Sequence, residues 1–211
     1  MLSLCLLIST FAAGAESKLE LKPGWKAVRT IASEHAHQAT AVDEAHFYAI
    51  SSTKVAVYDR DTGKLLRVSE GLASHLNSGF LHGGKVYCAH SNYPKTPETS
   101  DIRVYDPAAN TLTVFHEFKD PPGSLVWCVV RDGQWWCCFA HYGAEANAKT
   151  VLVRYADGFR ELARWAFPNV VVSDWDKMSA SGGVWDGDTL LVTHHHFKVL
   201  YRLRVPKAGA E

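Results

Sequence analysis

The stretch that decides the fold is residues 38–51, QATAVDEAHFYAIS, which runs from a polar residue into an apolar strand, through a turn and into a second apolar strand. The pattern starts again at Asn77, Ser124 and Ser181, and two further strands follow each of the first three copies. Self-similarity at a spacing of about 40 residues, with several short strands per unit, is typical of β-propeller blades. The sequence therefore predicts an all-β fold, a β-propeller of four-stranded antiparallel blades.

Apolar runs bounded by turn residues place the remaining strands of the first three blades. The predicted strands are 46–50, 54–59 and 64–68 in the first blade, 85–89, 101–106 and 111–115 in the second, and 135–140, 151–155 and 160–167 in the third. The fourth repeat supplies three strands, near 183–185, 189–193 and 199–205. We expect residues 25–31, an alternating segment, to complete that blade, because such closure removes two exposed sheet edges. The alternative is a shortened five-bladed propeller.

The first fifteen residues, 1–15, form a short apolar run that ends in a pattern of small residues. This is typical of a signal peptide, cleaved here after Ala15, and the run is too short to span a bilayer. We therefore expect a secreted or periplasmic protein in which residues 16–211 form a single propeller domain, without a membrane span.

The charge pattern excludes one class of partner. Formal net charge is zero across the 211 residues, and the Lys and Arg residues are scattered. A phosphate backbone requires a clustered basic surface, so we expect no nucleic-acid partner. The expected partner of this protein, which we predict to be a monomer, is a small molecule or a glycan.

Three of the four copies end their second strand in a histidine: His90, His141 and His194, with Ser51 in the first copy. Thirteen residues separate the start of the pattern from this position in the first, second and fourth copies, and seventeen in the third. The two intervals differ by an even number, which preserves the alternation of faces along a strand. We expect the four starting residues to ring the central axis on the same face as the histidines, forming a polar funnel.

Imidazoles in such a funnel can act as general acids, general bases or metal ligands. The predicted catalytic residues are therefore His90, His141 and His194. The predicted ligand-binding residues lie on the same loops: Gln38, His75, Asn77, Ser78, Asn92, Tyr142, Ser181 and His195. A divalent metal is compatible with these nitrogens, although no ligand-spacing motif is present, and the cofactor stays open. In the alternative interpretation each histidine only caps a strand by hydrogen bonding to neighbouring backbone groups.

Four cysteines follow the signal segment: Cys88, Cys128, Cys137 and Cys138. Adjacent residues of a strand point to opposite faces, so Cys137 and Cys138 do not form a chelating pair. The favoured interpretation is small buried hydrophobic side chains. A disulfide from Cys128 to Cys137 or Cys138 is the alternative.

Several local runs point to a family. They are 75–79 (HLNSG), 89–94 (AHSNYP), 135–136 (WW), 139–142 (FAHY) and 181–183 (SGG). From about Trp25 onward the chain resembles exported bacterial β-propeller proteins that carry the name cycloisomerase, of the carboxymuconate-cyclase-like type. Because relatives continue with a further strand and another blade, the resemblance also implies the shortened five-bladed alternative.

The resemblance implies cycloisomerase-like or lyase activity on a small ligand. Shared architecture alone does not establish shared chemistry, so a second class stays open: a non-enzymatic exported propeller that binds a protein or a glycan as a scaffold. The two classes differ in what the histidines do, since only the enzyme requires an acid or base at His90 and His141.

Overall fold

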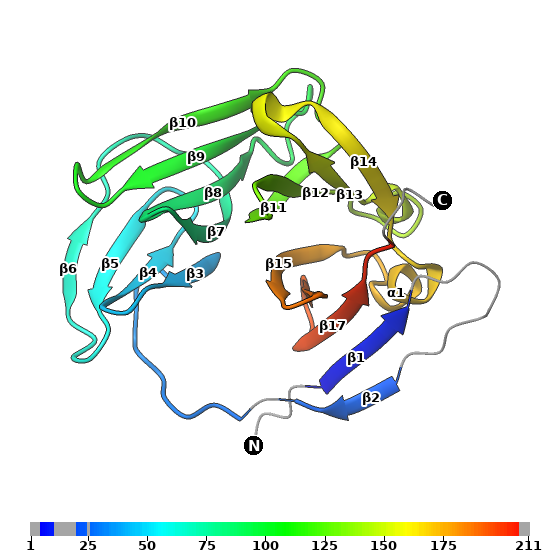
Figure 1. Ribbon diagram of the computed structural model, residues 1–211, viewed down its shortest axis with the longest axis horizontal. Coiled ribbons are helices and arrows are strands. Elements are labelled where there is room, and N and C mark those ends of the chain that lie inside the picture. The colour runs from blue at the N-terminus through cyan, green and yellow to red at the C-terminus, as the bar shows by residue number, and fades with distance from the viewer. Residues whose placement is uncertain (1–4, 11–19, 25, 207–211) are drawn as a thin grey trace. The chain divides into compact units, whose positions relative to one another are not determined.

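The computed structural model describes residues 5–10, 20–24 and 26–206, and in them the chain is almost entirely strand and turn (Figure 1). The strands form four sheets that run antiparallel from strand to strand along each repeat. The prediction of an all-β propeller with four-stranded antiparallel blades is confirmed. By its internal contacts the chain divides into a 30–130 unit and a 131–206 unit, which also takes in the described residues before Thr30. Each is described by itself.

The 30–130 unit contains the first two blades complete. The first has the order β3 (Ala39–Val42), β4 (His46–Ile50), β5 (Val55–Asp59) and β6 (Leu65–Val68). The second consists of β7 (Leu76–His82), β8 (Lys85–Ser91), β9 (Ser100–Asp106) and β10 (Thr111–Phe118), and β11 (Ser124–Arg131) then opens the third. Each blade is a meander, in which consecutive strands are hydrogen-bonded neighbours.

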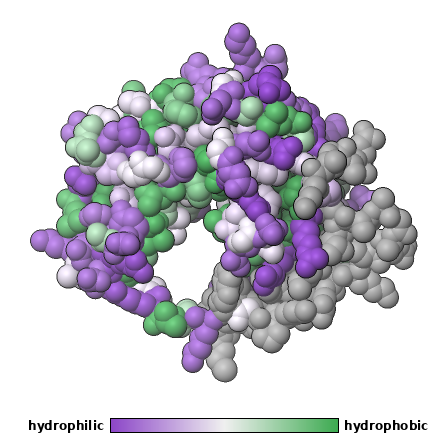
Figure 2. All heavy atoms as spheres, viewed as in Figure 1, coloured by the Kyte–Doolittle hydropathy of each residue, from purple (hydrophilic) through white to green (hydrophobic). Residues whose placement is uncertain are grey.

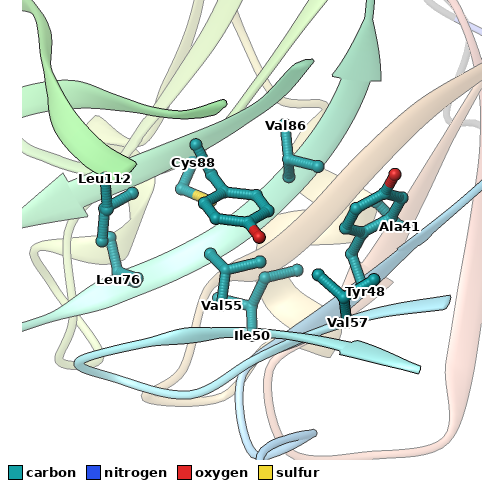
Figure 3. Close-up of a cluster of buried hydrophobic side chains, with 10 residues drawn as sticks. Ala41, Tyr48, Ile50, Val55, Val57, Leu76, Val86, Cys88 and Leu112 are labelled. Atoms are coloured by element: carbon teal, nitrogen blue, oxygen red, sulfur yellow. The ribbon is translucent and has the colours of Figure 1, made fainter. Parts of the chain in front are cut away.

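The hydrophobic core of this unit lies between the facing sides of its two blades (Figure 3). The first blade contributes Ala41, Tyr48, Ile50, Val55 and Val57, and the second Leu76, Val86, Cys88, Tyr105 and Leu112. The packing is close at Gly79, where an added Cβ would lie 2.6 Å from Ile50 Cδ1. Only a residue without a side chain allows Ile50 to fill that space.

Residues 69–75, here called the connector, join the two blades and are held along their length. Lys54 Nζ donates to the carbonyl oxygens of Ser69 and Gly71, both at 3.1 Å. Glu70 N donates to Asn110 O at 2.9 Å, and Leu112 N donates to Glu70 O at 2.7 Å. The connector therefore fixes the start of β7 against both blades.

A β-bulge interrupts the pairing of β7 with β8. Leu76 pairs with His90 and Gly79 with Cys88, so Asn77 and Ser78 together face one residue of β8. A second bulge stands at the equivalent place in β15, where Ala180 pairs with His194 and Gly182 with Thr193. The repeat spacing alone did not predict the extra residue in either strand. A bulge re-aims the side chain of the extra residue.

The 131–206 unit holds the remaining strands of the last two blades. They are β12 (Gln134–Ala140), β13 (Val151–Tyr155), β14 (Glu161–Ala166), β15 (Ala180–Asp186), β16 (Thr189–His194) and β17 (Val199–Arg204). Two 3-10 turns (Asn147–Lys149 and Asp157–Phe159) and the helix α1 (Asn169–Asp174) connect them. Trp136 stacks on Trp165 with ring centroids 5.3 Å apart, and Arg154 lies over both rings.

The strands beside β17 differ from the predicted closure. The last sheet has the order β15-β16-β17-β1-β2, in which β1 (Cys5–Thr10) pairs with β17 in parallel and β2 (Glu20–Pro23) follows. Residues 26–31 form no strand, and Trp25 lies outside the described residues. The alternating apolar pattern of residues 25–31 therefore does not identify the strand that pairs with β17. The predicted cleavage site at Ala15 also lies outside the described residues, and the signal peptide stays a prediction.

Two further observations concern the surface. Among the residues that the structure describes, no helix is long and apolar enough to cross a membrane. On the face shown in Figure 2, hydrophilic and apolar residues lie side by side.

Candidate functional site

His90 is the centre of a polar cluster in the 30–130 unit. It lies at the end of β8, where its neighbours across the sheet are Leu76 on β7 and Asp101 on β9. His90 Nδ1 is 2.7 Å from Asp101 Oδ2, and Nε2 is 3.2 Å from both the backbone nitrogen and the Oγ of Ser74. The imidazole is buried, with 7% of the residue exposed, whereas Ser74 is exposed on the connector. The cluster thus runs from a buried carboxylate through a buried imidazole to a hydroxyl at the surface.

The hydrogen bonds fix the tautomer of His90. Because the backbone N–H of Ser74 donates to Nε2, that nitrogen is unprotonated, and its single lone pair is shared between the N–H and the Oγ of Ser74. The ring proton therefore lies on Nδ1 and is donated to Asp101. Arg103 Nε donates to Asp101 Oδ1 at 2.6 Å and Nη2 to Oδ2 at 3.2 Å. Burial opposes ionisation of Asp101, but the hydrogen bonds from His90 and Arg103 outweigh it and hold the pKa of that carboxyl below its ordinary value. The carboxylate stays ionised and orients the imidazole.

An aromatic pair stands on the loops beside this cluster. The rings of His75 and Tyr93 meet edge to face with centroids 6.2 Å apart. Tyr93 is 40% exposed, and His75 is half-buried. The loop that carries Tyr93 is closed by Asn92, whose Nδ2 donates to Pro97 O and whose Oδ1 accepts from Thr99 N, both at 2.8 Å. Asn92, a predicted ligand-binding residue, therefore braces this loop.

The other predicted ligand-binding residues of this unit make internal contacts. Asn77 Nδ2 donates to the carbonyl oxygen of Leu125 on β11 at 2.7 Å and to Ser91 Oγ at 3.2 Å. Ser78 is buried in the bulge. Gln38 is exposed, and its Nε2 donates to Ser52 Oγ at 3.0 Å. Asn77 thus ties the second blade to β11, while Gln38 stays accessible to solvent.

In the 131–206 unit His194 caps the turn that follows its own strand. Its Nδ1 accepts hydrogen bonds from the backbone N–H groups of His196, at 2.8 Å, and Phe197, at 2.9 Å. The residue is 4% exposed, and burial lowers the pKa of the imidazole. This geometry is the strand-capping role that the sequence left as the alternative. A catalytic role for His194 stays a prediction.

His141 and the remaining predicted residues lie at the ends of the strands in the same unit. His141 N donates to Thr150 Oγ1 at 3.0 Å, and Thr150 Oγ1 lies 2.8 Å from Ser179 Oγ. The rings of Tyr142 and His195 meet edge to face with centroids 5.3 Å apart. His195 is exposed, Tyr142 is half-buried, and Ser181 is half-buried at the bulge of β15.

The structure thus brings predicted residues together within each unit. His75 lies one residue from the Ser74 of the His90 cluster, and Tyr142 contacts His195. A funnel that unites His90 with His141 and His194 stays a prediction. The sequence pattern did not predict the other residues of the His90 cluster, which are Ser74, Asp101 and Arg103. The cross-strand register of β8 and β9 would have found Asp101, since it lies opposite His90.

Groups of metal-ligating side chains and the cysteines were the other candidates for a chemical site in the described ranges. Within residues 5–10, 20–24 and 26–206, no group of three or more His, Cys, Asp or Glu side chains could hold a metal ion. Cys88, Cys137 and Cys138 are buried free thiols, so a disulfide from Cys128 to either Cys137 or Cys138 is not formed. Burial raises the pKa of the Cys88 thiol to about 12. The interpretation of these side chains as buried hydrophobic residues is confirmed by their positions.

Comparisons with known proteins give likeness of fold alone. No protein-family model matches the chain, and no curated protein matches it. Among solved structures, the computationally designed Ika4 protein is 10% identical, with a TM-score of 0.47 over 82% of this chain and 93% of that one. BamB from Moraxella catarrhalis is 14% identical (TM-score 0.44, 75% of this chain), and Kuenenia stuttgartiensis hydrazine synthase is 12% identical (TM-score 0.47, 71% of this chain). The matches span 41% of the BamB chain and 47% of the hydrazine synthase chain.

Proposed function

We propose that this β-propeller binds a small polar ligand, carboxylated or sugar-like, through the loops at its strand ends. The observation that carries the proposal is a repeated pair of side chains. Each unit holds an imidazole and a phenol edge to face, His75 with Tyr93 and His195 with Tyr142. Ligand sites combine an aromatic surface with a few polar groups, and each of these pairs supplies both.

The chemistry of such a pair fits the proposed ligand. The face of a tyrosine ring packs against the C–H groups of a sugar, while its hydroxyl both donates and accepts hydrogen bonds. The imidazole adds a donor and an acceptor at its two nitrogens. Tyr93 is 40% exposed and His195 is exposed, so solvent and a small ligand reach both groups.

Cycloisomerase-like or lyase activity is the enzymatic form of this proposal. Both reactions move a proton beside a carbonyl or carboxylate and therefore need a general base. His90 supports this form, because its Nε2 carries a lone pair and faces the exposed residue Ser74.

Binding without catalysis, to a glycan or a protein, is the second candidate. The observation that favours it is His194, whose Nδ1 is occupied by two backbone N–H groups. A buried imidazole nitrogen that accepts from two backbone N–H groups holds a turn in place. We also propose export, on the strength of the apolar run in residues 1–15. Amino-terminal sequencing of the protein recovered from a bacterial periplasm would test it, with a start at Glu16 expected.

Titration by NMR tests the ligand proposal. Aromatic ¹H–¹³C spectra would be recorded while muconate, galacturonate, glucose or citrate is added, using wild type, Tyr93→Ala, Tyr142→Ala and the control Leu66→Ala. Leu66 is an exposed residue of β6, 48% exposed. We expect at least one compound to shift Tyr and His signals saturably, with a Kd raised about tenfold or more in one tyrosine variant, which corresponds to about 1.4 kcal/mol. Unshifted aromatic signals at millimolar concentrations of every compound would refute the proposal.

The same samples separate the two candidates. Signals of the ligand itself, followed for a day, report any conversion to product. Product formed by wild type and abolished in His90→Gln would support the enzyme. Saturable binding without conversion would support the non-enzymatic candidate.

A further inference from the structure

We propose that Ser74, His90 and Asp101 form a nucleophilic triad that transfers acyl groups from small esters to water. This goes beyond ligand binding, because it assigns a covalent reaction to a residue that no predicted site contains. The order of contacts is that of a hydroxyl, a base and an orienting carboxylate: Ser74 Oγ to His90 Nε2 at 3.2 Å, and His90 Nδ1 to Asp101 Oδ2 at 2.7 Å. Such constellations occur on unrelated folds and are recognised by geometry.

The base and the carboxylate of the three residues are buried, whereas the hydroxyl group is on an exposed residue. Asp101 and His90 have side chains only 12% and 9% exposed, while Ser74 is exposed. The base and the carboxylate are therefore shielded from water, which strengthens their interaction, and the hydroxyl is open to a substrate. The carboxylate is ionised, and it holds the ring proton on Nδ1, so Nε2 can accept the proton of Ser74.

Arg103 is a positioning residue in this proposal. It donates two hydrogen bonds to Asp101, and its Nη1 donates to the carbonyl oxygen of Leu72 at 3.2 Å. One side chain thus fixes both the carboxylate and the connector that presents Ser74. Arg103 therefore links Asp101, which holds the imidazole, to Leu72, which lies two residues before Ser74 in the connector.

The reaction balances with an ester and water as the reactants. Ser74 Oγ bonds to the carbonyl carbon as its proton passes to His90 Nε2, and the carbonyl electron pair moves to oxygen. Collapse of this intermediate breaks the bond to the alcohol oxygen, which takes the proton from Nε2 and leaves. Water then attacks the acyl group on Ser74, gives a proton to Nε2, and the carboxylic acid departs as Ser74 regains its proton.

The geometry also predicts that turnover is slow. The backbone N–H of Ser74, a natural donor to the developing oxyanion, is directed to Nε2 at 3.2 Å. Without that donor the enhancement rests on the base, which contributes about 10²- to 10⁴-fold. Activated substrates are therefore the right probes: 4-nitrophenyl acetate for turnover and an alkyl fluorophosphonate for covalent capture of the serine.

The test is the rate and site of fluorophosphonate labelling, measured by intact mass and peptide mapping on the full chain. We expect one adduct on Ser74 in wild type and no adduct at this position in Ser74→Ala. The labelling rate should fall by about 10²-fold or more in Asp101→Asn and in His90→Gln. Ser173→Ala is the matched control, because Ser173 is an exposed serine on α1.

Circular dichroism and urea unfolding show whether each variant is folded, so a loss of labelling by unfolding is distinguished from a loss of the reactive group. Ser74→Ala removes only an exposed hydroxyl, so it remains folded even where the buried substitutions do not. Folded wild type that labels no faster than the control serines, or labels elsewhere, would overturn the triad and leave the cluster as a brace for the connector. This failure is separate from that of the ligand proposal, because labelling reports Ser74 and the titration reports the tyrosine rings.

Discussion

Replacing Gly71 by alanine should strongly destabilise the 30–130 unit, because the added Cβ meets the backbone of β10. Gly71 has φ +110°, a conformation that residues with a side chain rarely adopt. An added Cβ would overlap the carbonyl oxygen of Leu112 and lie 3.1 Å from its carbonyl carbon. The obstruction is backbone, held in β10, and has no rotamer by which to move away.

The expected loss follows from two contributions. A non-glycine residue in this region of φ and ψ costs about 1–3 kcal/mol. Relief of the overlap requires the connector to move off β10, which breaks the hydrogen bonds between Glu70 N and Asn110 O and between Leu112 N and Glu70 O. At about 1 kcal/mol each, these bring the total to about 3–5 kcal/mol.

Urea unfolding followed by tryptophan fluorescence measures the effect, and Gly84→Ala provides the control. Gly84 has φ +76°, but nothing lies within 4 Å of its added Cβ, so Gly84→Ala reports the conformational strain alone. That strain costs about 1–2 kcal/mol. We expect Gly71→Ala to lose about 2–4 kcal/mol more than Gly84→Ala. Equal losses in the two variants would refute the inference that the connector is pressed against β10.

Three further outcomes are expected. Asn77→Ala should lower the free energy of unfolding by about 1–3 kcal/mol in urea, because it leaves the carbonyl of Leu125 without its donor; a neutral effect would count against the tie between β7 and β11. Burial would raise the pKa of Asp43, yet hydrogen bonds from Tyr48 and two backbone N–H groups lower it to about 2. The ionised carboxylate therefore stabilises the fold by about 1–2 kcal/mol. This stabilisation is present at pH values above the ordinary pKa of 3.8 and is lost as pH falls towards 2. The free energy of unfolding of Asp43→Asn should therefore change less with pH in this acidic range than that of wild type. Cys88 should resist thiol reagents in folded protein and react at once in urea, and fast reaction without denaturant would contradict its burial.

The sequence predicted the strands well because blade strands are short and bounded by turn residues. The predicted segment 151–155 coincides with β13, and the predicted 101–106 and 189–193 each fall one residue short of β9 and β16. Alternation of apolar residues and glycine-containing turns fixes such boundaries locally.

Features that depend on partners distant in the sequence could not be predicted from local patterns. The bulges of β7 and β15 change the pairing by one residue without altering the apolar pattern, so counting could not reveal them. The alternation of 25–31 suits a strand, but whether it forms depends on which segment reaches the edge of β17, and that edge is occupied by β1. Ser74 was missed because only folding of the connector places it beside His90.

Equivalent positions in the repeats do not imply equivalent chemistry, and the two buried histidines show why. His90 and His194 both lie at the end of the second strand of a blade, and each pairs with the residue that precedes a bulge in the first strand. After His90 the chain makes a long loop and returns with Asp101 directly opposite, so Nδ1 donates to a carboxylate and Nε2 faces outward to Ser74. After His194 the chain turns at once, and Nδ1 accepts from the backbone of that turn. The length of the following loop and the residue that it brings across therefore decide whether a repeated imidazole pairs with a carboxylate or caps a turn.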